Sequence, residues 1–237
     1  MNRPPAISDP HAVAAEVRSR VEASVRSLNV SAVAPGFLDR MEKFAETLAL
    51  WGAKMNLTAR PSDPAEVAFH IIDSLMPIAL DSEVGAYPMR AIFGPAQRVL
   101  DIGSGAGFPG LVLAGASAAH FTLAESRRKR ASFLRTASAE MGLSNVTVEQ
   151  RRLSPADLNG DFDIAMTMAL GPLADFYAMA AAALVKGGTA ILYANPNQRL
   201  DQASARAVGL GAEARVAYQL RRGAAVVSRV LVLWRKL

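Results

Sequence analysis

The segment Arg98–Gly110, RVLDIGSGAGFPG, constrains the fold more than any other part of the sequence. A short apolar run leads directly into a loop that contains four glycines. Glycine lets the backbone bend tightly and approach a ligand without a Cβ in the way. A strand followed by such a loop and then a helix is the start of a βαβ unit, which requires a parallel sheet. The chain is therefore predicted to be an α/β protein that holds a nucleotide-like cofactor.

The pattern after Arg98 extends this prediction along the chain. Strands are expected at 98–102, 120–124, 145–149, 162–166 and 189–193, and helices at 109–118, 127–142, 171–185 and 198–208. Such alternation implies a parallel sheet with helices on both faces. The last two apolar segments, 212–220 and 225–237, flank RRGA and predict an antiparallel hairpin. A seven-stranded, Rossmann-like sheet ending in a hairpin is unusual for dinucleotide-binding proteins and is typical of methyltransferases.

The first 80 or so residues have helical periodicity instead. Valines four residues apart between Val13 and Val25 predict an amphipathic helix, and 61–80 is expected to form another. Between Phe37 and Met55, apolar residues recur at intervals of 4, 3, 4, 3 and 4, which predicts a helix whose apolar stripe packs into the core. We therefore expect an N-terminal helical extension at 1–85 and a main domain at 86–237. Residues 1–10 are Pro-rich and are expected to be disordered or loosely attached.

Composition narrows the class of protein. The chain has 237 residues, 51% of them apolar, and no cysteine, which favours a protein without disulfides. It has no signal-peptide core and no apolar run near the ~20 residues that span a bilayer, so a soluble, cytoplasmic protein without a membrane partner is expected. The net charge of +5 permits a polyanionic partner. Basic residues cluster at 127–130, 151–152 and 221–222, and no metal site is predicted.

The glycine loop fits two kinds of cofactor. The residues from Gly105 to Gly110 satisfy GxGxxG, the dinucleotide fingerprint. However, the preceding strand ends with Asp101, and a carboxylate at the loop mouth would repel a pyrophosphate. S-adenosylmethionine carries no phosphate, and its sulfonium and ammonium groups are positive. The D-x-G-x-G-x-G spacing of Asp101, Gly103, Gly105 and Gly107 therefore favours S-adenosylmethionine.

The next two strands predict the rest of the cofactor site. Glu125 ends the second strand about twenty residues past the loop, where a carboxylate can accept from both ribose hydroxyls. The third strand leaves through EQRRLSPADL, where Arg152, Leu153, Ser154 and Asp157 are candidates for contacting the adenine. NAD enzymes use the same carboxylate, so Glu125 indicates a ribose without choosing between cofactors.

From about Phe37 onward, the chain resembles a known family, the small-subunit rRNA guanine-N7 methyltransferases, also called glucose-inhibited division protein B. The resemblance rests on MNLTA (55–59), HIIDSL (70–75), VLDIGSGAGFPGLVLA (99–114) and LAESRRKRASFL (123–134). It implies a class I S-adenosylmethionine-dependent methyltransferase fold and methyl transfer to N7 of one guanine in 16S rRNA, with the small ribosomal subunit as partner. A monomer is expected. The predicted cofactor-binding residues are Asp101, Gly103, Gly105, Gly107, Phe108, Glu125, Arg152, Leu153 and Ser154.

The expected chemistry requires no catalytic side chain. Guanine N7 has a lone pair and no proton to lose, so positioning and electrostatics carry the rate of an in-line attack on the methyl group. His70 is therefore expected to pack or hydrogen-bond near the cofactor cleft, since a general base needs a proton to remove.

The sequence departs from the family on the substrate side. Met168 stands where the family usually has the arginine of Ser-Arg-Ala, and Ala194 with Asn195 replaces a Leu-Lys-Gly motif. Phe69 replaces an arginine, and Ser154 replaces an acid near the adenine. The substrate-side candidates are thus Met168, Ala194, Asn195 and His70. Two alternatives remain: a methyltransferase of this fold with a different substrate, since ANPN (194–197) weakly matches the Asn-Pro-Pro-Tyr loop of amino-methylating enzymes, or a non-catalytic RNA- or cofactor-binding homologue.

Overall fold

The computed structural model describes residues 9–28, 30, 33–80, 83–84, 87–88, 93–168 and 171–237. Its helices are α1 (Pro10–Ser27), α2 (Phe37–Gly52), α3 (Pro64–Ala79), α4 (Gly110–Ala116), α5 (Arg128–Glu140), α6 (Leu173–Ala183) and α7 (Gln202–Ala207), with a 3-10 turn, η2, at Pro155–Asp157. The strands of the main sheet are β3 (Arg98–Ile102), β4 (His120–Ala124), β5 (Val146–Glu149), β6 (Phe162–Thr167), β7 (Leu184–Ala194), β8 (Leu210–Arg222) and β9 (Ala225–Lys236). Two short strands, β1 (Glu83–Val84) and β2 (Tyr87–Pro88), form a separate antiparallel pair.

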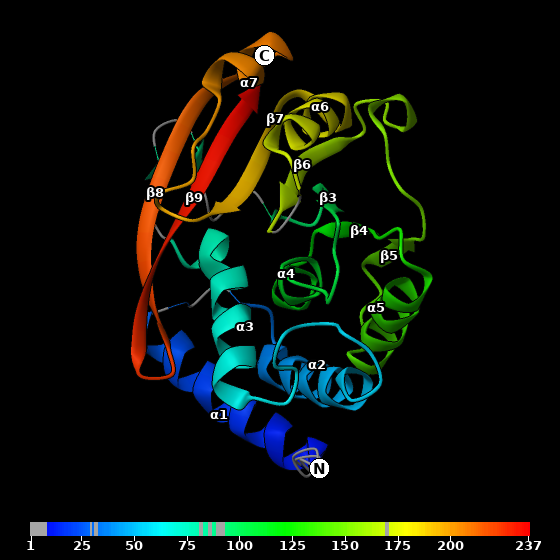
Figure 1. The fold of residues 1–237 in the computed structure, drawn as a ribbon, viewed down its shortest axis with the longest axis vertical. Coiled ribbons are helices and arrows are strands. Elements are labelled where there is room, and N and C mark those ends of the chain that lie inside the picture. The colour runs from blue at the N-terminus through cyan, green and yellow to red at the C-terminus, as the bar shows by residue number, and fades with distance from the viewer. Residues whose placement is uncertain are drawn as a thin grey trace, which may run out of the picture.

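The main sheet has seven strands in the order β5-β4-β3-β6-β7-β9-β8 (Figure 1). Strand β3 pairs in parallel with β4 and β6, and Asp101 lies opposite Leu123 on one side and Met166 on the other. Strand β9 inserts between β7 and β8 and is antiparallel to both. The predicted parallel sheet with a C-terminal antiparallel hairpin is confirmed.

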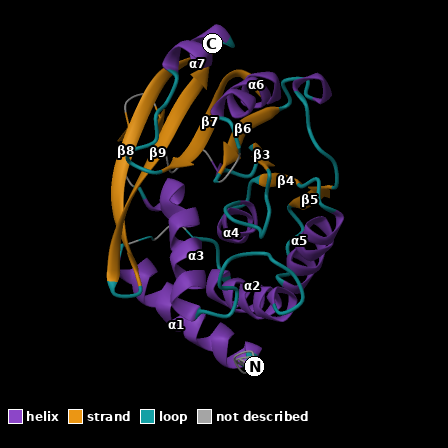
Figure 2. Cartoon of the chain, viewed as in Figure 1, coloured by secondary structure: helices purple, strands orange, loops and turns teal. Residues whose placement is uncertain are grey.

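Helices cover both faces of this sheet because its apolar side chains alternate between two cores (Figure 2). The larger core contains sheet residues such as Val99 and Phe121, packed against helices α1 to α5. The smaller core contains Leu100 and Trp234 with the apolar faces of α6 and α7. The carboxyl ends of the parallel strands therefore meet at one edge between two layers of helices, where ligands of open α/β sheets bind.

The three N-terminal helices contribute to the larger core. The apolar stripe that begins at Phe37 packs there as predicted, with Met41, Phe44 and Leu48 fully buried. Arg40 of α2 also donates to the carbonyl oxygen of Gly115 in α4 (3.1 Å). The division into an extension and a main domain stays a prediction, and its boundary at residues 85 and 86 lies outside the described residues.

Several element boundaries differ from the predicted ones. Helix α2 ends at Gly52 rather than Met55, and Ala53 and Lys54 form a turn after it. The predicted helix 171–185 ends at Ala183, and the following strand starts at Leu184, before the Gly187–Gly188 pair. Helix α1 begins at Pro10, because the Asp9 side chain accepts from the His11 amide (3.1 Å) and caps the helix. The disorder predicted for residues 1–10 is therefore wrong at Asp9 and Pro10, and the rest of that segment, 1–8, lies outside the described residues.

No helix in the described part of the chain is long and apolar enough to cross a membrane. Among the same residues, no group of three or more His, Asp or Glu side chains is arranged to hold a metal ion.

Candidate active site

The glycine loop between β3 and α4 has a left-handed backbone at three of its glycines. The φ angles are +78° at Gly103, +54° at Gly105 and +90° at Gly107, a region that glycine adopts without steric cost. The amides of Gly103 and Ser104 both donate to the carbonyl oxygen of Ala124, at 3.0 and 3.1 Å. The loop is therefore fixed against the carboxyl end of the neighbouring strand, β4.

Asp101 lies beneath this loop and not at its mouth. Its side chain is 1% exposed, and its Oδ2 accepts from the amide of Gly110 at the start of α4 (3.2 Å). A Cβ on Gly110 would lie 2.4 Å from that oxygen, so only glycine fits there. Burial raises the pKa of Asp101 to about 7. The expected carboxylate at the loop mouth is thus wrong, and the argument that an exposed charge there selects the cofactor fails with it. Contact of Asp101 with the cofactor stays a prediction.

Glu125 joins the glycine loop to the next helix. Its Oε2 accepts from the amide of Gly105 (3.1 Å), and its Oε1 accepts from the amide of Arg127, which precedes α5 (2.7 Å). The residue is 6% exposed. Each carboxylate oxygen retains a second lone pair, so the group can still accept from a hydroxyl. The predicted ribose contact fits this position and stays a prediction.

A cavity of 490 Å³ opens beside these residues, at the carboxyl ends of β3, β4 and β5. Its lining includes Gly103 and all three residues predicted near the adenine, namely Arg152, Leu153 and Ser154. The volume is within the range of nucleoside-sized sites. The opposite wall comes from Gly171, Pro172, Asp175, Ala178 and Met179, at the start of α6. Sequence reasoning missed this wall, because nothing in the sequence of a helix reports which loop it faces.

The exit loop after β5 is held in place by its own polar groups. The Ser154 amide and hydroxyl both donate to Asp157 Oδ2, at 2.8 and 2.6 Å. These bonds lower the pKa of Asp157. Asp157 therefore caps the η2 turn rather than lining the cavity, while Arg152 has no ion-pair partner among the described residues.

His70 and Phe108 meet on the other side of the glycine loop. Their ring centroids lie 5.2 Å apart, and Phe108 also packs edge-on against Phe44 of α2 (5.2 Å). The Nε2 atom of His70 is 3.3 Å from Glu66 Oε1. Burial lowers the pKa of His70 despite the opposing effect of Glu66, so the neutral ring is favoured at neutral pH. The histidine thus links α3 to the glycine loop by packing.

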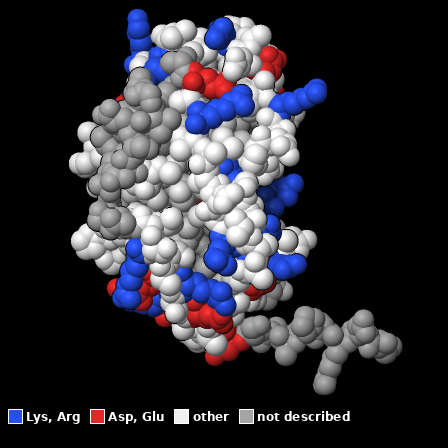
Figure 3. All heavy atoms as spheres, turned by 90° about the vertical axis from the view of Figure 1, so that its left-hand side faces the viewer, with Lys and Arg blue, Asp and Glu red and all other residues white. Residues whose placement is uncertain are grey.

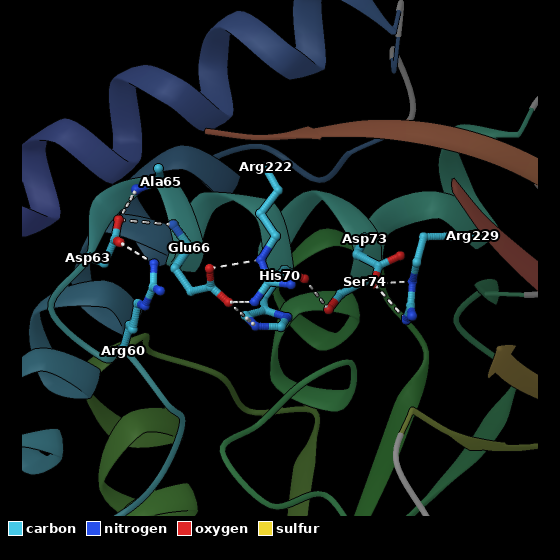
Figure 4. A network of polar contacts seen from close by, with 9 residues as sticks. All are labelled: Arg60, Asp63, Ala65, Glu66, His70, Asp73, Ser74, Arg222 and Arg229. Atoms are coloured by element: carbon cyan, nitrogen blue, oxygen red, sulfur yellow. Dashed lines mark hydrogen bonds and ion pairs between the residues drawn. The ribbon is translucent and has the colours of Figure 1, made fainter. Parts of the chain in front are cut away.

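A network of polar contacts joins α3 to the C-terminal hairpin (Figure 4). Arg222 forms a double hydrogen bond to the Glu66 carboxylate, and its Nε–Oε2 distance is 2.9 Å. Arg229 donates to Asp73 Oδ2 (3.0 Å), and the Tyr218 hydroxyl donates to Asp73 Oδ1 (2.6 Å). The sequence analysis did not identify these three hairpin residues. The acids of α3, which fall among apolar neighbours, were the available signal.

The four substrate-side candidates have different surroundings. Asn195 is exposed at the end of β7, and its Oδ1 accepts from Arg229 (2.9 Å). Met168 is half-buried after β6 and packs against the larger core. Ala194 is 2% exposed and packs in the smaller core. The substrate-side role of all four residues stays a prediction.

Comparison with known proteins shows the family of the chain. The family model described as rRNA small subunit methyltransferase G matches residues 38–217. The ribosomal RNA small subunit methyltransferase G of Halorhodospira halophila is 36% identical over 66% of this chain and 68% of that protein. The protein of the same name from Acidiphilium cryptum is 37% identical over 76% of this chain and 74% of its own length.

Solved structures show the fold. The tRNA (m1A58) methyltransferase from Aquifex aeolicus superposes with a TM-score of 0.51 at 15% identity, over 70% of this chain and 68% of that one. The S-adenosylmethionine-dependent O-methyltransferase from Thermotoga maritima gives a TM-score of 0.51 at 14% identity, over 82% of this chain and 71% of that one. With the family match, the glycine loop and the sheet order, these findings lead to one conclusion: the chain belongs to the ribosomal RNA small subunit methyltransferase G family and has the class I S-adenosylmethionine-dependent methyltransferase fold.

Proposed function

We propose that this protein transfers the methyl group of S-adenosylmethionine to N7 of a guanine in the 16S rRNA of the small ribosomal subunit. One observation carries the proposal: the glycine loop, tied to Glu125, borders a 490 Å³ cavity lined by Arg152, Leu153 and Ser154. This arrangement fits a nucleoside cofactor in size and donor set. The family membership supports the RNA substrate. A ribosomal substrate places the protein in the cytoplasm.

The residues of the chain hold the cofactor in this proposal. Glu125 accepts from the ribose hydroxyls, and Leu153 with Ser154 contacts the adenine. Asp101 keeps the loop and the start of α4 in register, because its carboxyl group accepts from the Gly110 amide. S-adenosylmethionine, when bound, supplies an electrophilic methyl group on a sulfonium.

The remaining requirement is orientation of the guanine. Its N7 lone pair needs no general base, and the favoured neutral form of His70 accords with a packing role. Phe108 and Asn195 lie on the edge where the base would approach, and Arg229 orients the Asn195 amide through its oxygen. The ANPN segment (194–197) lacks the aromatic fourth residue of an Asn-Pro-Pro-Tyr loop, so the amino-methylating alternative is less favoured.

Methyl transfer to isolated small subunits tests the proposal. Subunits from cells that lack this protein are incubated with tritiated S-adenosylmethionine and the purified protein, and N7-methylguanine is mapped in the 16S rRNA. The proposal predicts tritium at one guanine N7. Label that moves into protein or a small molecule would indicate another substrate, and cofactor binding without transfer would indicate a non-catalytic homologue.

A further inference from the structure

A second cavity lies outside the cofactor site, between the end of α2 and the start of α5. It has a volume of 540 Å³ and is lined by Leu50, Trp51, Lys54, Met55 and Lys129. We call it the Trp51 groove. Leu50 is 48% exposed, which is rare for a large apolar residue in the described part of the chain. The Trp51 ring packs edge-on against Phe133 of α5, with ring centroids 5.9 Å apart, and this contact fixes its orientation. The groove thus combines an apolar floor with two lysines.

The charges around the Trp51 groove are not neutralised by the protein. Within the described part of the chain, neither Lys54 nor Lys129 has an acidic partner, and Arg127 and Arg128 beside them are exposed. The arginines of α1 differ, since Arg20 is paired with Glu16. Unpaired positive charge at the rim of an apolar groove attracts a polyanion.

The face on the β8 side of the molecule has a cavity of its own, of 440 Å³, whose lining includes Phe69, Leu220 and Arg221. Over the described part of this face, Asp and Glu lie near its two ends, while Lys and Arg lie there and along one side (Figure 3). Helix α5 lies on the opposite side of the molecule (Figure 1). The two lysines of the Trp51 groove therefore lie on the side of the molecule away from β8.

The Trp51 groove is next to the glycine loop. Arg130, which follows Lys129, donates to the carbonyl oxygen of Asn56 (3.3 Å). Its NH1 atom also lies 3.8 Å from where a Cβ of Gly105 would stand. Helix α5 begins just after the carboxyl end of β4, so the groove opens at the same edge of the sheet as the cofactor cavity. A chain lying in the groove would continue toward the proposed site of methyl transfer.

We propose that the Trp51 groove binds a single-stranded segment of the RNA substrate, with one base stacked on the Trp51 indole and phosphates at Lys54 and Lys129. Base stacking on an aromatic ring combined with basic groups along the backbone is how proteins hold single strands. An acidic peptide would satisfy the lysines but would leave the indole without a planar partner. This inference rests on the proposed function, because it assumes an RNA substrate.

Tryptophan fluorescence provides a direct test with the intact protein. The chain has two tryptophans, and Trp234 is only 1% exposed, so Trp51 is the one that a ligand can reach. The probe is an unstructured 12-nucleotide RNA, and binding is measured by quenching and by fluorescence anisotropy of labelled RNA. We expect saturable quenching. Trp51→Leu should weaken binding about tenfold or more, and Trp51→Phe should restore most of it.

The lysines are tested separately, since Trp51 also packs against Phe133. The affinity falls as salt is added, so the slope of log affinity against log salt is negative. The Lys54→Gln/Lys129→Gln variant should make this slope shallower by roughly 1.4, at about 0.7 per phosphate contact. Lys186→Gln, at an exposed lysine near the start of β7, is the matched control and should change neither quantity. Calorimetric affinity for S-adenosylmethionine should be unchanged in all variants.

The outcomes separate this inference from the proposed function. Wild-type affinity and salt slope in the double-lysine variant would overturn the groove assignment, as would quenching by poly-glutamate but not by RNA. If wild-type protein methylates subunits and the groove variants leave its KM unchanged, the groove assignment fails and the proposed function stands. If RNA binds in the groove but subunits receive no methyl group, the proposed function fails and the groove stands.

Discussion

Arg229 of β9 donates from Nε to Oδ2 of Asp73 in α3 at 3.0 Å, across 156 positions of the sequence. The Asp73 side chain is 1% exposed and that of Arg229 is 14% exposed, so the pair is largely shielded from water. The same guanidinium donates to Asn195 at the end of β7. One arginine thereby connects the hairpin, the helix and the substrate-side edge of the sheet.

We expect Asp73→Asn to lower the free energy of unfolding by about 3 kcal/mol, because removing one partner of a buried pair leaves the other charge uncompensated. Urea denaturation measures this loss. Glu16→Gln, in an exposed pair with Arg20, is the matched control and should cost less than about 1 kcal/mol. Equal losses in the two variants would show that the Asp73 pair contributes no more than a surface pair.

Gly110→Ala should reduce affinity for S-adenosylmethionine at least about tenfold and lower stability. Its Cβ would stand 2.4 Å from both Asp101 Oδ2 and Leu123 Cδ2, so the glycine loop must shift. Calorimetry and thermal denaturation check both effects. Gly142→Ala is the control, since a Cβ there meets nothing within 4 Å. That variant should keep cofactor affinity and lose only about 1 kcal/mol, the cost of a left-handed backbone at alanine. Unchanged binding in Gly110→Ala would refute a rigid loop.

The stability of the protein should depend on the ionisation of Asp101. Burial raises its pKa from 3.8 in the unfolded chain to about 7 in the folded one. Between these values the folded state binds the extra proton, so this residue's contribution to stability falls as the pH rises toward 7. The slope is about 1.4 kcal/mol per pH unit at most.

His70 has the opposite effect, because its lowered pKa makes the folded state more stable as the pH rises through about 6. The Asp101→Asn variant retains His70, so its difference from the wild type isolates the contribution of Asp101. The free energy of unfolding of both proteins is measured between pH 4.5 and 7.5. The value for the variant should increase relative to that of the wild type as the pH rises. A constant difference across that window would mean that Asp101 stays ionised in the folded protein.

Glu125→Gln should weaken binding of S-adenosylmethionine by about ten- to a hundredfold, because hydrogen bonds to a charged acceptor contribute roughly 1.5–3 kcal/mol. The glutamine also retains a single acceptor oxygen for Gly105, Arg127 and the ribose. Calorimetry provides the measurement. Glu149→Gln, at the end of the next strand, breaks an exposed pair with Arg151 and serves as the control. Similar affinities in both variants would remove Glu125 from the cofactor site.

Met168→Arg tests whether the substrate side is that of a weakened rRNA methyltransferase. A guanidinium at the end of β6 would add a phosphate contact, so the rate of methyl transfer to small subunits should rise, by up to about tenfold for one charge-assisted hydrogen bond. Met168→Gln, which adds polarity without charge, should not raise it. An unchanged rate of methyl transfer in Met168→Arg would indicate that this edge of the sheet binds another substrate.

The sequence by itself determined most of the elements and the residues of the proposed cofactor site. The βαβ alternation, the glycine loop and the terminal hairpin are local patterns, so they could be read before any contact was known. The placement of Glu125 and of Arg152, Leu153 and Ser154 follows from the same logic, because carboxyl ends of parallel strands share one edge of the sheet.

Tertiary structure decided how these residues are used. Asp101 is buried because α4 closes over it, and burial converts an expected surface charge into a group with a raised pKa. Arg222 and Arg229 reach α3 because β9 inserts between β7 and β8, and Ala194 is buried in the smaller core by the face of β7 on which it falls. Such contacts join residues far apart in the chain. They depend on strand order and side-chain direction, which no local pattern encodes.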